Sequence, residues 1–150
     1  MSNGARVPIA ATHAVRDTCI CLHVQRAARA LARRFDEALR PLGLTNGQFS
    51  LLMSLNRPAP ARMRQVAELL VMDRTTLTAA LKPLERRGLV TVSVDESDRR
   101  GRRLGLTPAG HKLLRAALPV WQREHARVEA EAARQKTSLG RMREDLRIFA

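Results

Sequence analysis

The chain has 150 residues, a formal net charge of +13 and 24 arginines against 3 lysines, while only 3% of its residues are aromatic and tyrosine is absent. This length allows one folding unit and the charge favours a polyanionic partner, but the scarcity of aromatic rings argues against single-strand or RNA binding by base stacking. Because no apolar run of about 18 residues and no secretory signal is present, we expect a cytoplasmic protein without a membrane span.

Residues 1–16 are small and mostly uncharged, and they predict a flexible N-terminal tail. Residues 17–42 predict a dimerisation helix that begins at Asp17 or Thr18, since apolar side chains recur there at helical spacing. These apolar positions are Ile20, Val24, Ala27, Leu31, Phe35 and Ala38.

Residues 43–110 predict a winged helix-turn-helix unit. Thr45 and Gln48 form a capping box for one helix, and Met63–Leu70 is a short amphipathic helix. Asp73 then caps a helix that Gly88 ends. Because its first turn is polar and rich in hydroxyl groups, we expect this helix to be the recognition helix for the major groove of DNA.

Two β-type runs, Leu89–Val94 and Arg102–Thr107, follow and flank a polar, arginine-rich loop. A basic hairpin suits the narrow, negatively charged minor groove of DNA. A recognition helix followed by such a wing is the arrangement of a winged helix-turn-helix DNA-binding protein.

Residues 111–150 predict C-terminal dimerisation helices, the first capped by Thr107 and Pro108 and the last beginning at about Ser138. The apolar stripes at both ends of the chain present more apolar surface than a small winged unit can bury. We therefore expect a mainly α fold with a small β-wing, in which helices from both termini form a homodimer. A two-fold dimer would place its recognition helices roughly 34 Å apart on a palindromic site.

Several short motifs, in this order and spacing, resemble the multiple-antibiotic-resistance regulator (MarR) family of bacterial transcription factors over about residues 17–150. The motifs are Leu-Gly-Leu-Thr (42–45), Leu-Glu-Arg-Arg-Gly-Leu-Val (84–90), Asp-Arg-Arg (98–100) and Leu-Thr-Pro-Ala-Gly (106–110). The resemblance implies a dimeric regulator that represses, or less often activates, nearby genes and releases DNA when a small molecule binds or a thiol is oxidised. One departure is Ser97, which stands where the family commonly has an arginine.

The resemblance assigns Arg100 to the minor groove, with Asp98 orienting it through a salt bridge and Arg99 or Arg102 compensating for Ser97. We also expect side chains on the recognition helix and on the helix before it to contact base edges or phosphates of the DNA. These candidates are Arg74, Thr75, Thr76, Thr78, Lys82, Arg86, Arg64 and Gln65. The alternatives are that Thr76 only caps its helix with Asp73 and that the phosphate candidates are solvated surface residues.

In the small-molecule branches of the family, the effector lies between the dimerisation helices and the winged unit. Four residues could supply a cation and flat surfaces for a small aromatic or phenolic carboxylate there: His23, Arg26, Trp121 and His125. Such residues are equally compatible with dimer contacts or ordinary core packing.

The alternative function is a thiol-based, oxidant-sensing repressor of the organic-hydroperoxide type. Cys21 matches the sensing cysteine of that branch by its spacing to Arg29 and Ala30, although the branch supports its cysteine with tyrosines. Helical residues two apart point about 200° from each other, so Cys19 and Cys21 cannot share a metal or close a disulfide within one helix. On that helix Cys21 falls among apolar residues and is predicted to be buried.

An enzyme is not expected, because the sequence has no nucleophile elbow, phosphate-binding glycine loop, HExxH motif or paired carboxylates. We likewise expect no cofactor and no metal site. A basic protein that coats nucleic acid without sequence preference would share the charge, but it would need neither a capped recognition helix nor apolar stripes for a dimer.

Overall fold

The computed structural model describes residues 6–150, which form a mainly helical fold with one small antiparallel sheet. This agrees with the fold predicted from the sequence. In chain order the elements are α1 (Ile9–Thr18), α2 (Ile20–Leu39), η1 (Arg40–Leu42), α3 (Asn46–Ser54), β1 (Ala61–Arg62), α4 (Met63–Leu70), α5 (Arg74–Arg86), β2 (Val90–Asp95), β3 (Asp98–Leu106), α6 (Pro108–Arg134), α7 (Leu139–Leu146) and η2 (Arg147–Phe149).

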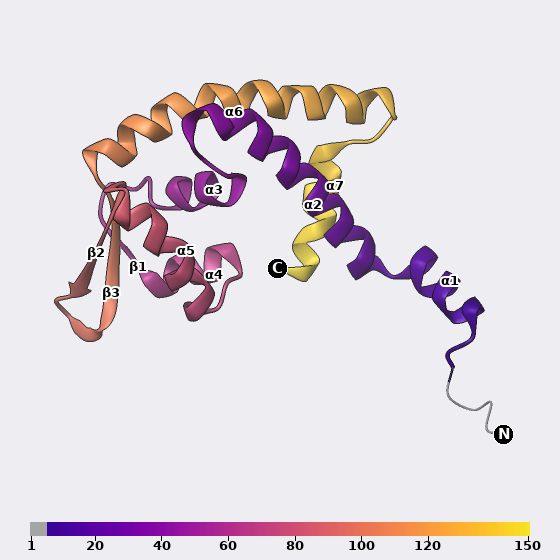
Figure 1. The fold of residues 1–150 in the computed structure, drawn as a ribbon, viewed down its shortest axis with the longest axis horizontal. Coiled ribbons are helices and arrows are strands. Elements are labelled where there is room, and N and C mark those ends of the chain that lie inside the picture. Colours follow the sequence, from indigo (N-terminus) through magenta and orange to yellow (C-terminus); the bar gives the residue numbers. More distant parts are fainter. Residues whose placement is uncertain (1–5) are drawn as a thin grey trace.

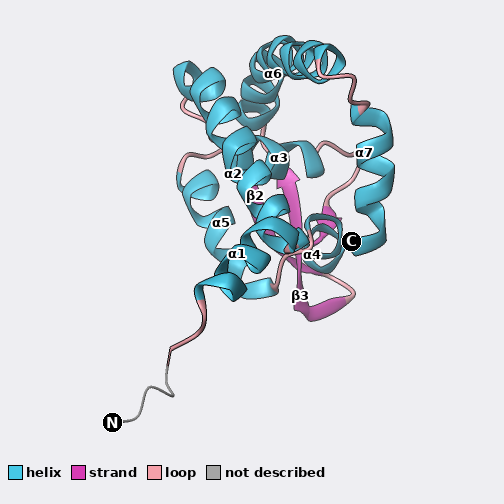
Figure 2. Cartoon of the chain, turned by 90° about the vertical axis from the view of Figure 1, so that its right-hand side faces the viewer, coloured by secondary structure: helices cyan, strands magenta, loops and turns pink. Residues whose placement is uncertain are grey.

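The elements divide into a compact winged unit and long helices that extend from it. Figure 1 shows α3, α4, α5 and the sheet gathered at one end, with α6 running over them and α2 crossing the molecule diagonally. Beyond the winged unit α6 ends and α7 folds back, so that the C-terminus returns toward α4 in both views (Figures 1 and 2).

The core lies inside the winged unit, which fixes the orientation of α5. Leucines from α3, α5 and β3 are fully buried there together with Val66 of α4. Phe35 and Leu39 at the end of α2, and Leu114 and Ala117 near the start of α6, are also buried. Both long helices are therefore anchored on the winged unit by one end only.

The helix caps predicted from the sequence are present. Thr45 and Gln48 form both hydrogen bonds of a capping box, and the side chains of Asp73 and Thr107 accept hydrogen bonds from the first turns of α5 and α6. Gly88 follows Arg87, the C-cap residue of α5, and adopts the left-handed conformation (φ 66°) expected of a glycine that ends a helix.

The sheet has the strand order β1-β3-β2, and its hairpin is tighter than predicted. Asp95 pairs with Asp98, so Glu96 and Ser97 alone form the turn. Because β3 begins four residues before the predicted Arg102, Arg99 and Arg100 lie on a strand rather than in a long loop. The two-residue strand β1 is too short to give a sequence pattern and forms through its pairing with β3.

The N-terminal prediction is wrong in the described part of the tail, while residues 1–5 lie outside the described residues. Residues 9–18 form α1, whose alanines favour a helix and whose Thr18 hydroxyl donates to the carbonyl oxygen of Ala14 at 2.7 Å. The predicted dimerisation helix starts at Ile20 rather than residue 17, because Cys19 adopts an extended conformation (ψ 103°) between α1 and α2.

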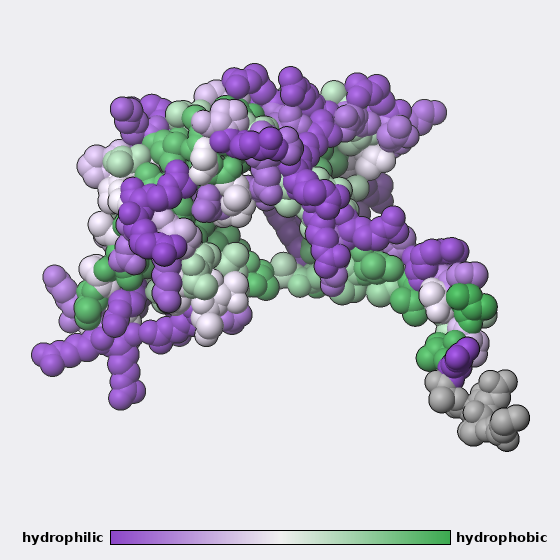
Figure 3. Space-filling view, in the orientation of Figure 1, coloured by the Kyte–Doolittle hydropathy of each residue, from purple (hydrophilic) through white to green (hydrophobic). Residues whose placement is uncertain are grey.

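Apolar side chains remain exposed on both terminal helical regions. They are Ile20, Val24 and Leu31 on α2, Met142 and Leu146 on α7, and Ile148 and Phe149 in η2. Figure 3 shows a hydrophobic band crossing the centre of this face. Within residues 6–150 no helix combines the length and apolar character needed to cross a membrane.

Candidate nucleic-acid interface

Helix α5 has one buried face and one exposed, polar face. Leu77, Leu81 and Leu84 are buried in the core. Thr75 and Lys82 lie on the opposite side, since residues seven apart share one face of a helix. Arg74, Thr78 and Arg86 are also exposed. The helix predicted to be the recognition helix is therefore α5, whose polar face is exposed to solvent on the surface of the winged unit.

The threonines of α5 differ in how their hydroxyl groups are used. Thr76 donates its hydroxyl to Asp73 at 2.6 Å while its backbone N–H donates to the other oxygen of the same carboxylate at 2.8 Å. Thr78 donates to the carbonyl oxygen of Arg74 at 2.7 Å. Thr75 makes no side-chain hydrogen bond to any described residue, so its hydroxyl is the one that remains free for a DNA base or phosphate.

The first residue of α5 is hydrogen-bonded to the wing. Nη2 of Arg74 donates to the carbonyl oxygen of Arg100 at 3.2 Å. Arg99 and Arg100 are exposed, and Figure 3 shows hydrophilic side chains projecting from the hairpin end of the molecule. The arginine side chains of the wing therefore extend into solvent from a strand whose backbone is tied to α5.

Asp98 acts differently from the prediction. Its carboxylate accepts a hydrogen bond from the backbone N–H of Arg100 at 3.0 Å, and no salt bridge joins it to the Arg100 guanidinium in the described structure. The prediction of a salt bridge was wrong because the tight turn brings the backbone, not the long side chain, to this carboxylate. Asp98 thus fixes the strand from which Arg100 projects.

The side chains of the candidates Arg102, Arg64 and Gln65 already make contacts within the chain. Nη1 of Arg102 donates to the carbonyl oxygens of Arg99 and Gly101, at 3.3 and 3.0 Å. At the start of α4, Arg64 pairs with Glu68 at 3.1 Å, and the side-chain oxygen of Gln65 accepts from the backbone N–H of Arg62. These residues are exposed or half-buried, so a phosphate would have to compete with these contacts.

Sequence reasoning missed the most buried charge of the wing. The Asp95 carboxylate, only 3% exposed, lies 3.0 Å from Nε of Arg103 and 3.3 Å from Nε of Arg62. Hydrogen bonds from Ser97, then the nearby Arg103, hold the pKa of the Asp95 carboxyl below its usual range. Asp95 is the last residue of a β-type run and is followed by two further acidic residues, Glu96 and Asp98, so the sequence alone does not single it out.

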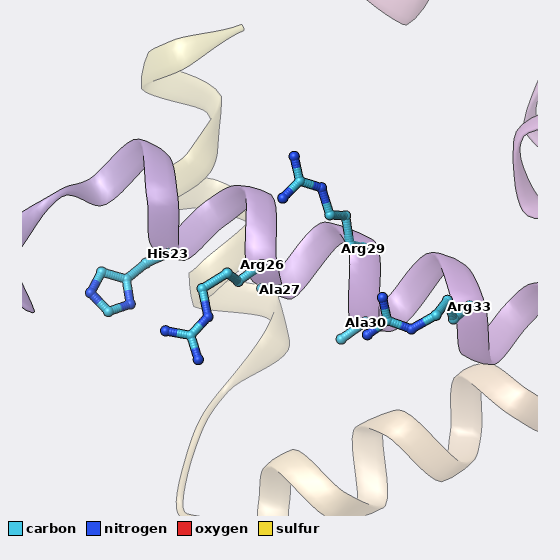
Figure 4. Close-up of a pocket in the computed structure, with 6 residues that line it drawn as sticks. All are labelled: His23, Arg26, Ala27, Arg29, Ala30 and Arg33. Carbon is cyan, nitrogen blue, oxygen red and sulfur yellow. The ribbon is translucent and has the colours of Figure 1, made fainter. Parts of the chain in front are cut away.

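The four predicted effector residues lie at two separate places. Trp121 lines an apolar cavity of about 410 Å³ between α3, α4 and α6. The His125 ring stacks on the Trp121 ring with ring centroids 4.7 Å apart. His23 and Arg26 instead line a hollow of about 640 Å³ along the polar face of α2 (Figure 4). The four residues do not share one pocket in the single chain, because α2 is buried against the winged unit only near its C-terminal end, at Phe35 and Leu39.

The apolar cavity contains the flat surfaces that the prediction required but no arginine. Phe49 stacks on Trp121 with ring centroids 6.1 Å apart. The other lining residues are Ser50, Met53, Ser54, Leu69, Leu70 and Leu118.

The cysteines are not placed as predicted. Cys19 is the residue between α1 and α2, so the two thiols do not belong to one helix, and Cys21 is exposed rather than buried in the single chain. Nε2 of Gln25 donates to Sγ of Cys21 at 3.1 Å. Among the described residues, no group of three or more His, Cys, Asp or Glu side chains is arranged to hold a metal ion.

The fold and this basic surface define a winged helix-turn-helix DNA-binding protein, and known proteins agree. The sequence model of the MarR family matches residues 44–101. The structure of the transcriptional regulator MosR from M. tuberculosis, in complex with DNA, is similar over 85% of this chain and 90% of that protein, with 38% identity and a TM-score of 0.77.

Two curated proteins are also similar. The organic hydroperoxide resistance transcriptional regulator of Bacillus subtilis is 27% identical over 108 residues, or 72% of this chain and 74% of that protein. The transcriptional activatory protein BadR of Rhodopseudomonas palustris is 35% identical over 88 residues, or 57% of this chain and 50% of that protein. The chain belongs to the MarR family of DNA-binding transcriptional regulators, and its relatives are regulators rather than enzymes.

Proposed function

We propose that the protein binds a palindromic operator in double-stranded DNA as a homodimer, with α5 in the major groove and the β2–β3 wing in the adjacent minor groove. The observation that supports this most directly is the hydrogen bond from Arg74 to the Arg100 carbonyl, because it joins the two DNA-facing elements into one unit. The exposed guanidinium groups of Arg99 and Arg100 then suit the negative potential of a narrow minor groove.

Substitution of Arg100 by alanine tests the role of the wing. The DNA for this test is a duplex that the wild-type protein selects from a random pool. We expect Arg100→Ala to bind this duplex at least tenfold more weakly than the wild-type protein at moderate salt. Arg115→Ala is the matched control, since Arg115 is exposed on α6 and outside this interface. Unchanged affinity of Arg100→Ala would contradict the proposed minor-groove contact.

The homodimer is supported by the apolar side chains that α2, α7 and η2 leave exposed. Leu31, which is 43% exposed on α2, would be covered by the second copy. We expect Leu31→Asp to shift the protein toward monomers in sedimentation experiments and to weaken DNA binding. The same change at Leu69, 59% exposed on α4, should leave assembly unchanged. A monomeric wild-type protein would contradict the proposal.

We further propose that the protein is a repressor released by a small aromatic or phenolic effector in the cavity beside Trp121. A cavity of about 410 Å³ is within the range that small ligands occupy. Because Trp121 is the one tryptophan of the chain, its fluorescence reports binding directly. We expect aromatic carboxylates that quench this fluorescence to release operator DNA, and Met53→Trp, which fills the cavity, to bind DNA without responding.

A promoter reporter separates repression from activation. Loss of the protein should raise expression from a promoter that contains its operator. A fall in expression would instead indicate an activator, as in the related transcriptional activatory protein BadR.

A second candidate function is oxidant sensing through Cys21, with Cys19 close by. It is favoured by the exposure of the Cys21 thiol and by similarity to the hydroperoxide regulator of Bacillus subtilis. In this reaction the Cys21 thiolate attacks the peroxide, the O–O bond breaks, and the sulfur is oxidised to a sulfenic acid while the departing alkoxide takes a proton from water to give the alcohol. Cumene hydroperoxide should then release DNA from the wild-type protein but not from Cys21→Ser. Identical behaviour of both proteins would exclude this function.

A further inference from the structure

Asp95 lies at the point where the wing meets the start of α4, and two charged groups and one polar group, from three segments, surround it. Arg103 comes from the paired strand β3, Arg62 from the end of β1, and Ser97 from the hairpin turn. Although its neighbours Val94 and Glu96 are exposed, Asp95 is buried where the register between β2 and β3 shifts. A buried carboxylate is costly unless it is paired and hydrogen-bonded, so this arrangement needs all its partners.

The two carboxylate oxygens of Asp95 are used by different partners. Oδ1 accepts hydrogen bonds from the Ser97 hydroxyl at 2.8 Å and from the Ser97 backbone N–H at 3.1 Å. Oδ2 faces the Nε atoms of Arg103 and Arg62. The Ser97 hydroxyl also lies 3.3 Å from Nη2 of Arg62, which closes a ring of contacts between the turn, the carboxylate and the start of α4.

We propose that Asp95, Arg62 and Arg103 form a positioning cluster that sets the angle of the wing relative to α4, and that Ser97 completes it. The proposal rests on the minor-groove role of the wing proposed above. Arg62 and Arg103 hold the hairpin through Asp95, whereas Arg99 and Arg100 extend to the DNA. Ser97 serves the cluster through its hydroxyl group, which donates a hydrogen bond to Oδ1 of Asp95.

The proposal predicts the opposite sign from simple electrostatics. Removal of a negative charge from a DNA-facing surface strengthens phosphate binding when charge alone decides. Loss of the Asp95 charge should instead weaken binding, because Arg62 and Arg103 lose the partner that fixes the hairpin. Glu96, the next residue, is exposed and is in no ion pair within the described structure, so it provides a matched control.

The decisive experiment compares Asp95→Asn with Glu96→Gln on the selected duplex by affinity and by two footprints: hydroxyl radicals report the minor groove, and dimethyl sulfate methylation of guanine N7 reports the major groove. We expect Asp95→Asn to bind about tenfold more weakly and to lose protection of the minor groove while the major-groove protection by α5 remains. Glu96→Gln should bind as tightly as the wild-type protein or slightly more tightly. Equal or tighter binding by Asp95→Asn would overturn the proposal, as would parallel loss of protection in both grooves.

Two further variants keep the test decisive if Asp95→Asn does not fold. Arg62 is 55% exposed on its side chain, so Arg62→Gln should fold and show the same selective loss of minor-groove protection. Arg103→Lys, which keeps the positive charge beside Asp95, should retain most of the affinity. If Arg100→Ala binds normally, the proposed role of the wing fails; if only Arg100→Ala weakens binding and Arg62→Gln does not, the positioning cluster alone fails.

Discussion

Arg74, the first residue of α5, and Arg100, on the wing strand β3, are 26 residues apart in sequence and joined by a hydrogen bond of 3.2 Å from a guanidinium to a backbone carbonyl. The side chain of Arg74 was predicted to contact DNA directly. In the structure one of its nitrogens instead holds the strand that carries another predicted DNA contact. Helix α5 and the wing are thereby coupled at the ends that the proposed function places on DNA.

We expect Arg74→Ala to weaken DNA binding and to loosen the wing in the protein without DNA. Because the bond to the Arg100 carbonyl is lost, amide hydrogen exchange in residues 98–101 should become faster. Hydrogen exchange measured by mass spectrometry checks this, with Arg86→Ala as the control on the same helix. Unchanged exchange in residues 98–101 would show that Arg74 does not hold the wing.

Thr75 and Thr76 should separate DNA contact from helix stability. Thr76→Val removes the hydroxyl bond to the capping Asp73 and should lower stability by about 1 kcal/mol in urea unfolding. Thr75→Val removes a hydroxyl with no partner in the described structure, so it should lower DNA affinity at unchanged stability. Loss of stability in Thr75→Val with normal affinity would contradict its assignment to the DNA surface.

Gly110 is required where α6 passes over the start of the sheet. A Cβ atom at this residue would lie far inside contact distance of the Leu89 backbone carbonyl, which cannot move without displacing β2. We expect Gly110→Ala to lower the free energy of unfolding by about 3 kcal/mol. Gly140 in α7 has no such neighbour, and Gly140→Ala should be neutral or stabilising. Similar stabilities of the two variants would contradict this packing.

The ion pairs between α2 and α6 should give a pH-dependent contribution to stability. Arg34 contacts Glu124 and Glu131, and Nη1 of Arg127 donates to Glu124 at 3.1 Å. The hydrogen bond from Arg34 holds the pKa of the Glu124 carboxyl below its ordinary value. A lowered folded-state pKa stabilises the protein above the unfolded pKa and loses this effect as the pH falls through the folded pKa.

We therefore expect Glu124→Gln to be less stable than the wild-type protein at pH 7 by about 1 kcal/mol. The difference should shrink as the pH falls below about 4.3, the ordinary pKa of glutamate. Denaturant unfolding at fixed protein concentration and several pH values measures it. A difference that persists unchanged to pH 3 would show that the Glu124 charge is not responsible.

Local patterns predicted the order of the elements well, because each helix cap is a property of a few neighbouring residues. Thr45 with Gln48, Asp73 and Thr107 all cap helices as expected. The break at Cys19 was missed, since both sides of it are helical and neither glycine nor proline marks it.

The candidate site was predicted less completely, because its geometry depends on contacts between distant segments. The pairing of β1 with β3 brings Arg62 to Asp95, 33 positions later in the chain, and no local pattern indicates this contact. The separation of His23 and Arg26 from Trp121 likewise follows from the direction in which α2 leaves the winged unit.

The measurement that tests the central claim most directly is selection of duplexes from a random pool, with the number of chains per bound duplex determined by mass. We expect an inverted repeat whose half-sites are about one helical turn, roughly 34 Å, apart, bound by two chains. Enrichment of no sequence, or binding of one chain to a single half-site, would contradict a homodimer that recognises DNA with paired α5 helices and wings.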